Sequence, residues 1–236
     1  ITMLEPEYIQ HLESNTWFYQ LPTLLKTFIV HHAVEQTYQK QQTIFHSGDS
    51  FDGLYAVLAG VVRLGYIDIE GNESVAAIVE PIMWFGEISL VDGQPRSHDA
   101  TCLEKSLILH IPSAAIQQLL IEQPIFWYHI AQLTTQKLRF AFLELISIQT
   151  QNMTQRSAQR LMFILNGYGN HLIIEKNMIH LSQEQLAQML TCSRQTVNQE
   201  LQRLEKQNIL RLSFRKIEIL DITALERIAH DFPKHD

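Results

Sequence analysis

The chain has 236 residues, of which 46% are hydrophobic, and its formal net charge is −7. This length is sufficient for one large domain or two ordinary domains with hydrophobic cores. No apolar run reaches the roughly 18 residues of a membrane span, and the first residues lack the basic start and apolar core of a secretory signal. We therefore expect a cytoplasmic protein.

The charge is unevenly distributed along the chain. Residues 1–149 hold 7 Lys and Arg against 16 Asp and Glu, whereas residues 150–236 hold 11 against 9. Within the second part, residues 182–216 hold 6 basic and 3 acidic side chains. A local basic excess of this kind is typical of a nucleic-acid-binding surface, so the acidic N-terminal part must have another role.

The first predicted elements are helices. Residues 3–20 carry apolar side chains such as Leu4 and Leu12 at helical spacing, which predicts one short amphipathic helix ending before Pro22. A second helix is expected over Leu24–His31.

From residue 34 to residue 111 the sequence consists of short runs rich in β-branched and aromatic residues, separated by turns with Gly, Asp and Asn. The predicted strands are Thr43–Phe45, Leu54–Ala59, Val61–Ile67, Val75–Val79 and Leu107–Ile111. Many short strands with this punctuation predict a β-sandwich or a barrel-like roll.

The stretch FGEISLVDGQPRSHD, residues 85–99, contains groups that suit an anion. A turn after a strand can present backbone N–H groups to an anion, while a guanidinium and a hydroxyl are natural partners of a phosphate. Glu87 is suited to accept a hydrogen bond from a sugar hydroxyl. A surface turn with an ordinary Arg–Glu pair explains the stretch equally well when it is taken alone. The candidate ligand-binding residues are Gly86, Glu87, Ile88, Ser89, Arg96 and Ser97.

Two helices are predicted next, one opened by Ser113 and ended by Pro124, and a longer one from Ile125 to about Ser147. The longer helix has apolar and small residues spaced alternately by four and three, which predicts a coiled-coil seam of about three heptads and hence a homodimer. The residues of this seam are Trp127, Ala131, Thr134, Leu138, Ala141, Leu145 and Ile148. The flanking Phe126, Phe140 and Phe142 are expected to pack on the chain's own core. Gln149–Asn152 is expected to be a polar hinge before a helix over Thr154–Leu165.

The stretch LSQEQLAQMLTCSRQTVNQELQRLEKQ, residues 181–207, predicts two helices joined by a tight turn. Ser182 with Gln185 forms a capping box, and Ser193 is the N-cap of the second helix. The exposed start of that helix carries Arg, Gln and Asn side chains that can pair with base edges, so it is predicted to read DNA. An ordinary helical hairpin is the alternative, although its exposed turn is more usually rich in Glu and Lys.

A basic hairpin is predicted after this helix, over Ile209–Leu220, with a polar turn at residues 213–215. Such a wing can lie along the phosphate backbone, where contacts position the protein but do not specify the sequence. The candidate DNA-binding residues of the helix pair and the wing are Ser182, Ser193, Arg194, Gln195, Thr196, Asn198, Gln199, Arg215 and Lys216.

Together these motifs resemble the bacterial transcription regulators of the cAMP receptor protein and fumarate-nitrate reduction regulator family. The motifs GDSFDGLYAVLAGVVRL, FGEISL followed by PRS, the long helix and LAQMLTCSRQTVNQELQRLEKQNIL occur in the family's order. The resemblance implies an α+β chain with three parts. Residues 1–112 would form an N-terminal helix and an effector-binding β-roll of the cyclic-nucleotide-binding type, residues 113–150 a linker and dimerisation helix, and residues 151–236 a winged helix-turn-helix domain.

The same resemblance implies a homodimer that binds an inverted repeat in double-stranded DNA, contacts RNA polymerase and activates or represses transcription. In cyclic-nucleotide-binding members the positions matching the FGEISL and PRS motifs hold the sugar-phosphate, so cAMP or a related cyclic nucleotide is the expected effector. No catalytic motif is present, and an enzyme is not expected.

Several positions depart from the family pattern. His98 follows Arg-Ser where cyclic-nucleotide binders usually have Ala, and Ala141 and Phe142 stand where the cAMP receptor has a Thr-Ser pair that contacts adenine. Ala141 and Phe142 are thus possible ligand contacts of a different kind. In the recognition helix, Gln195 replaces a Glu and Gln199 replaces an Arg.

The two cysteines and the histidines bear on metals and cofactors. Cys102 and Cys192 show neither a disulfide framework nor a zinc pattern, and no cysteine precedes Cys102, so an iron–sulfur cluster and a metal site are not expected. The histidines have no paired ligand spacing and are interpreted as structural or surface residues. The alternative function is a regulator of the same fold whose pocket is degenerate, so that it is ligand-independent or responds to a different ligand.

Overall fold

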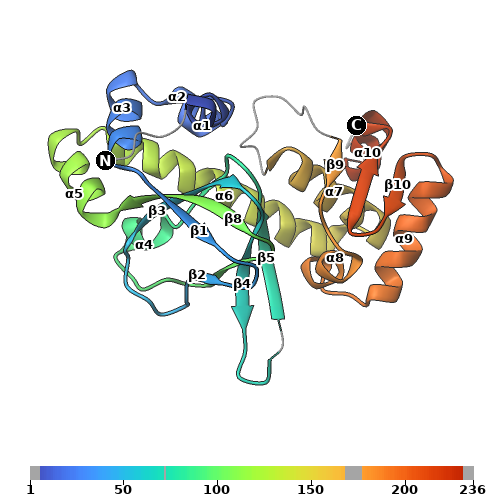
Figure 1. Ribbon diagram of the computed structural model, residues 1–236. Coiled ribbons are helices and arrows are strands. Elements are labelled where there is room, and N and C mark those ends of the chain that lie inside the picture. The colour runs from blue at the N-terminus through green and yellow to red at the C-terminus, as the bar shows by residue number, and fades with distance from the viewer. Residues whose placement is uncertain (1–5, 72, 168–176, 231–236) are drawn as a thin grey trace. The chain divides into compact units, whose positions relative to one another are not determined.

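The structure is a computed structural model that describes residues 6–71, 73–167 and 177–230 (Figure 1). The chain folds as two units. Among the described residues, the first unit contains those up to Leu138 and the second contains those from Arg139 onward. The division falls inside the long helix, between Leu138 and Arg139.

The N-terminal segment of the first unit forms three helices: α1 (Pro6–Leu12), α2 (Thr16–Gln20) and α3 (Thr23–His32). The single helix predicted over residues 3–20 is therefore wrong, apart from residues 3–5, which lie outside the described residues. The chain breaks because Asn15 caps α2, its side chain accepting a hydrogen bond from the backbone N–H of Phe18. Trp17 then packs edge-on against Trp84, with ring centroids 5.2 Å apart, which anchors α2 to the roll.

Two four-stranded antiparallel sheets form the predicted roll, which follows the three N-terminal helices in Figure 1. One sheet has the order β1-β8-β3-β6 and the other the order β2-β7-β4-β5. The first comprises β1 (Val34–Tyr38), β8 (Ser106–Pro112), β3 (Gly53–Ala59) and β6 (Trp84–Phe85). The second comprises β2 (Thr43–Phe45), β7 (Asp99–Cys102), β4 (Val62–Ile67) and β5 (Glu73–Val79). The five predicted strands are all present, and β1, β6 and β7 are added to them.

Two further helices, α5 (Ser113–Glu122) and α6 (Phe126–Thr150), follow the roll. Phe126, Ile130 and Leu133 of α6 are buried in the same apolar core as Trp84 and Phe18. Their spacing of four and three residues places one face of α6 in the core of the first unit, as an amphipathic helix requires.

The other face of α6 is exposed. Trp127, Leu138, Leu145 and Ile148 have relative exposures of 44%, 52%, 55% and 53%. Phe140 contacts Phe163, whereas Phe142 is 56% exposed, so the expectation that Phe142 packs on the chain's own core is wrong. Thr150 is still helical, and the predicted hinge is correspondingly shorter.

The second unit begins with α7 (Met153–Leu165), for which Asn152 and Gln155 form a capping box. The helix pair follows as α8 (Gln183–Leu190) and α9 (Arg194–Lys206), and α10 (Ile222–Ala229) packs against α7. A small antiparallel sheet has the order β10-β11-β9. Its strands are β9 (Met178–Ile179), β10 (Leu210–Ser213) and β11 (Lys216–Ile219).

Candidate functional site

The turn after β6 begins the candidate ligand site. Gly86 has a φ of +93°, a left-handed conformation that glycine adopts without a Cβ clash, and a Cβ there would lie 3.1 Å from a guanidinium nitrogen of Arg96. Glu87 then starts the short helix α4 (Ile88–Asp92), in which Ser89 is buried. The glycine thus allows the arginine to approach the turn closely.

One cavity of the first unit, with a volume of about 50 Å³, collects all six predicted ligand-binding residues. Phe45, Leu64, His98 and Lys137 complete its lining. Ala141 and Phe142, the two long-helix positions expected near a ligand, are exposed residues of the second unit.

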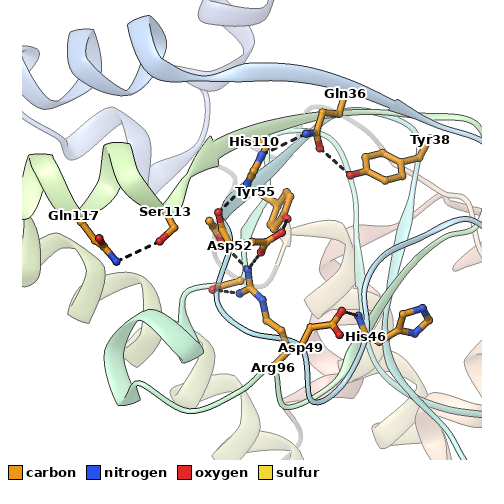
Figure 2. Close-up of polar contacts among 12 residues, drawn as sticks. Gln36, Tyr38, His46, Asp49, Asp52, Tyr55, Arg96, His110, Ser113 and Gln117 are labelled. Atoms are coloured by element: carbon orange, nitrogen blue, oxygen red, sulfur yellow. Dashed lines mark hydrogen bonds and ion pairs between the residues drawn. The ribbon is translucent and has the colours of Figure 1, made fainter.

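Arg96 is the central cation of this cavity and is only 3% exposed. Its guanidinium donates hydrogen bonds to the carbonyl oxygens of Gly86 at 2.6 Å and Gly53 at 2.8 Å. It also forms an ion pair with Asp52 at 2.5 Å, which Figure 2 shows. The aromatic ring of Phe45 lies 4.3 Å from the guanidinium carbon. These contacts fix the arginine before any ligand is present.

A polar network continues from Asp52 toward β1 (Figure 2). The Tyr55 hydroxyl donates to the other carboxylate oxygen of Asp52 at 2.5 Å, and His110 stacks on Tyr55 with centroids 4.6 Å apart. Gln36 connects His110 to Tyr38, because its amide nitrogen lies 3.4 Å from Nδ1 of His110 and its oxygen accepts from the Tyr38 hydroxyl. A nitrogen donor at Nδ1 implies the neutral tautomer with the proton on Nε2, which faces the Asp52 carbonyl at 3.2 Å.

The network shifts the pKa values of its members. Burial raises the pKa of Asp52, but hydrogen bonds from Tyr55 and Arg96 outweigh it, so the net pKa is lowered and Asp52 stays ionised. Burial and the hydrogen bond to Asp52 raise the pKa of Tyr55. Burial lowers the pKa of His110, against the opposing influence of Asp52.

Glu87 is 1% exposed and forms a second ion pair, with Lys137 of α6, at 2.6 Å. Sequence reasoning missed Lys137. A signal was available, because Lys137 precedes the candidate position Ala141 by four residues and so lies on the same helical face. This ion pair is the link in the structure between the FGEISL turn and the long helix.

Three buried polar atoms that line this cavity have no hydrogen-bond partner among the described residues. They are Oε1 of Glu87, Nε of Arg96 and Nε2 of His98. Buried polar groups are nearly always paired, so three unpaired ones around one cavity suit the binding of a polar ligand. The His98 ring was expected to be a structural or surface group, and the structure instead places it in the cavity wall.

Burial lowers the pKa of His98, and Lys137 and Arg96 lower it further, while Glu87 and Asp99 oppose them. The ring is therefore neutral at physiological pH. Its Nδ1 lies 2.9 Å from the Ser97 hydroxyl. When that hydroxyl donates, Nε2 carries the proton and is a neutral donor into the cavity.

The second unit holds the predicted DNA-reading helices in the expected form. The Ser182 hydroxyl accepts from the Gln185 backbone N–H at 3.1 Å, and the Gln185 side chain accepts from the Ser182 N–H at 2.9 Å. Thr191, with a left-handed φ of 53°, ends α8, and the Ser193 hydroxyl accepts from the Thr196 N–H at 3.0 Å. The two serines thus act as N-caps, and the backbone of Thr196 is hydrogen-bonded to one of them, Ser193.

The first turns of α9 expose Arg194, Gln195 and Gln199. Asn198 is less free, because its amide donates to Gln183 of α8 at 2.9 Å. Behind α9, Val197, Leu201 and Leu204 are fully buried. The buried side fixes the helix, and the exposed side offers a guanidinium and two amides.

Two arginines of α7, which the sequence reasoning did not single out, form hydrogen bonds to the C-terminal end of α8. Arg156 donates to the Leu190 carbonyl at 2.7 Å, and Arg160 donates to the Met189 carbonyl at 3.2 Å while pairing with Glu144. The last carbonyls of a helix lack intrahelical partners, so cations satisfy them well.

The wing is a two-residue hairpin. Ser213 pairs with Lys216 at the end of the β10–β11 register, and Arg211 forms an ion pair with Glu218 across the strands. Arg215 and Lys216 are exposed. Among the described residues, the wing cations without an ion-pair partner therefore lie at its tip.

Comparisons with known proteins agree with both halves of this geometry. The profile of the "Cyclic nucleotide-binding domain" matches residues 35–123, and that of the "Crp-like helix-turn-helix domain" matches residues 155–228. The "Cyclic AMP receptor protein" of Thermus thermophilus is 30% identical over 193 residues, which cover 81% of this chain and 86% of the relative. The chain belongs to the CRP/FNR family of transcriptional regulators.

Other relatives support the same assignment. The "CRP-like cAMP-activated global transcriptional regulator" of Mycobacterium tuberculosis is 26% identical over 193 residues, covering 81% of this chain and 86% of the relative. The solved structure of FixK2 from Bradyrhizobium japonicum shares the fold, with a TM-score of 0.71 at 19% identity over 83% of this chain and 96% of that chain. This CRP/FNR regulator thus combines a cyclic nucleotide-binding domain with a DNA-binding helix-turn-helix. None of its described helices has the length and hydropathy to span a membrane.

Proposed function

We propose that this regulator is a cytoplasmic homodimer whose β-roll binds cAMP in the cavity around Arg96 and whose two DNA-binding units read an inverted repeat beside RNA polymerase. The single observation that carries the effector proposal is the set of three buried, unpartnered polar atoms around one cavity. They are a donor on a cation, an acceptor on a carboxylate and an imidazole nitrogen. A cyclic nucleotide offers a phosphate, a ribose hydroxyl and ring atoms to match them.

Different residues of the cavity would bind different groups of the ligand. Nε of Arg96 can donate a hydrogen bond to a phosphate oxygen. The other two guanidinium nitrogens keep the ion pair with Asp52 and the hydrogen bonds to the two carbonyls. Oε1 of Glu87 can accept a hydrogen bond from a ribose hydroxyl, while Oε2 keeps its ion pair with Lys137. Gly86, Ile88, Ser89 and Ser97 complete the wall.

The dimer is proposed from the exposed face of α6. Leu138, Leu145 and Ile148 follow the predicted spacing of seven and three residues, and all are more than half exposed. A run of exposed apolar side chains at this spacing is stabilised when a second copy of the helix packs against it. Two units related by a two-fold axis then bind two half-sites about one helical turn apart.

The effector proposal is tested by calorimetry with cAMP and cGMP, and with AMP as the non-cyclic control. Binding of cAMP at a hundred times its dissociation constant should stabilise the protein by about 2.7 kcal/mol. Stabilisation by AMP equal to that by cAMP would mean that the cavity does not select the cyclic phosphate.

A second candidate function is a regulator that binds DNA without an effector. One observation favours it: the charges of Arg96 and Glu87 are already paired within the chain, with Asp52 and Lys137 respectively. Absence of calorimetric heat together with unchanged DNA affinity on adding either nucleotide would establish this alternative.

A further inference from the structure

The tip of the wing carries an exposed aromatic residue that the contacts described so far do not explain. Phe214 is 87% exposed, and it lies in the two-residue turn between Ser213 and Lys216. An exposed apolar side chain at a hairpin tip also occurs in the roll, at Ile69, but there the neighbours are acidic. Phe214 is followed by Arg215 and Lys216, so this ring lies beside two cationic residues.

The backbone of the turn supports a role for its side chains. Arg215 has a φ of 54°, a left-handed conformation in which Gly or Asn is the usual residue of a tight turn. An ordinary side chain is strained in that conformation. The Arg215 guanidinium lies 5.5 Å from the centre of the Phe214 ring, in an exposed cation–π contact. The tip therefore holds a cation and an aromatic ring together on a backbone that Gly or Asn would adopt more easily.

The wing is fixed to the reading helix. The Glu205 carboxylate, in the last turn of α9, accepts a hydrogen bond from the Leu212 backbone N–H at 2.8 Å, and Leu210 and Ile219, which pair at the base of the hairpin, are buried. When the start of α9 occupies a major groove, a hairpin held beside that helix reaches the bordering phosphate strand and the minor groove beyond it.

We propose that Phe214 enters the minor groove next to each half-site as an apolar wedge, while Arg215 and Lys216 contact the flanking phosphates. Apolar side chains inserted at a base step unstack it and bend the duplex, at a cost of about a few kcal/mol that the added contacts offset. Flexible TA and CA/TG steps unstack most easily, so the wing prefers them at a position that α9 does not touch. This inference rests on DNA binding by α9.

The test compares Phe214→Ala and Phe214→Leu with the parent protein on a duplex selected from random DNA by the parent. Bending is measured by energy transfer between dyes on the two duplex ends, and affinity is measured as a function of salt. Phe214→Ala should reduce the bend and weaken binding about tenfold on sites with a TA step, with an unchanged salt slope. Phe214→Leu should retain most of the bend, since it keeps an apolar wedge.

Arg215→Ala is the matched control on the neighbouring residue. It should lower the salt slope by about one while leaving the bend in place. Equal bending and affinity of Phe214→Ala and the parent would overturn the wedge. So would a loss of polymerase-dependent transcription with DNA bending intact, because the tip would then face a protein. A parent that binds no DNA would instead contradict the proposed function of α9.

Discussion

At the scale of single residues, Arg96 has a structural role and is also the residue that we propose binds the effector. Its guanidinium joins β3, the turn after β6 and Asp52, and Nε is the guanidinium nitrogen that has no partner among the described residues. A binding arginine of this kind is prepared in advance, because its side-chain entropy is already lost when the ligand arrives. The same contacts mean that shortening this side chain should also destabilise the fold.

Arg96→Ala should therefore abolish cAMP-induced stabilisation and also lower the free energy of unfolding by about 2 kcal/mol, because the carbonyls of Gly53 and Gly86 lose their buried donor. Arg96→Lys keeps a cation for Asp52 and should unfold less easily than Arg96→Ala, while still binding cAMP more weakly than the parent. Urea unfolding and calorimetry measure the two effects separately. Equal cAMP affinity in Arg96→Lys and the parent would remove the arginine from the ligand site.

His98 makes stability depend on pH. Its folded pKa is lowered mainly by burial, so the unfolded chain binds a proton more readily than the folded chain, and stability is lost as pH falls from the ordinary value of 6.5 toward the folded value. The unfolding free energy should decrease between about pH 7.5 and pH 5.5.

His98→Ala should flatten part of that decrease, and His110, whose pKa is also lowered, should account for a further part. Urea titrations at stepped pH measure the slope for each variant. A slope that is the same in His98→Ala and the parent would show that the ring is solvated.

At the scale of elements, α9 is fixed by its buried side and by its neighbours. Val197, Leu201 and Leu204 fill the core of the second unit, and Arg156 and Arg160 hold the end of α8, against which α9 packs. The exposed first turn therefore has little conformational freedom, which is the condition for the base readout that we propose for Arg194 and Gln195.

Arg194→Ala should weaken binding to the selected site by about 1–3 kcal/mol and relax the preference at one base pair of each half-site, because arginine forks to guanine. Arg203→Ala is a control on the last turn of the same helix and should leave the base preference unchanged. Repeating the selection from random DNA with each variant measures this. A consensus unchanged by Arg194→Ala would exclude this residue as a reader.

The sequence predicted the elements whose signals are local. The caps at Ser182 and Ser193, the apolar face of α9 and the short strands depend on neighbouring residues, and all are found in the structure. The partners of Arg96 and Glu87 were not predictable, because Asp52 and Lys137 lie 44 and 50 residues away and only the folded roll brings them together. The break between α1 and α2 was missed because Asn15 was read as part of a helix rather than as its cap.

At the scale of the whole molecule, the acidic, basic and exposed apolar residues lie in different parts of the chain. The acidic N-terminal part contains the cavity that we propose for the effector, the basic segment around α9 contains the proposed DNA surface, and α6 contributes residues to both units. The Glu87–Lys137 ion pair attaches this helix to the cavity. A ligand that binds Glu87 would therefore change an ion pair of the same helix that we propose as the dimer contact.

Leu138→Glu combined with Leu145→Glu should convert the dimer to a monomer, because each helix would bring two carboxylates to the seam, at a cost of about 3 kcal/mol or more. Leu24→Glu is the matched control, since Leu24 is 57% exposed on α3, away from the seam. Sedimentation velocity gives the oligomeric state. The seam variant should bind an isolated half-site as the parent does but lose the added affinity of the inverted repeat, which requires two linked units. A parent that sediments as a monomer, or a seam variant that still distinguishes the inverted repeat from the half-site, would place the dimer contact elsewhere.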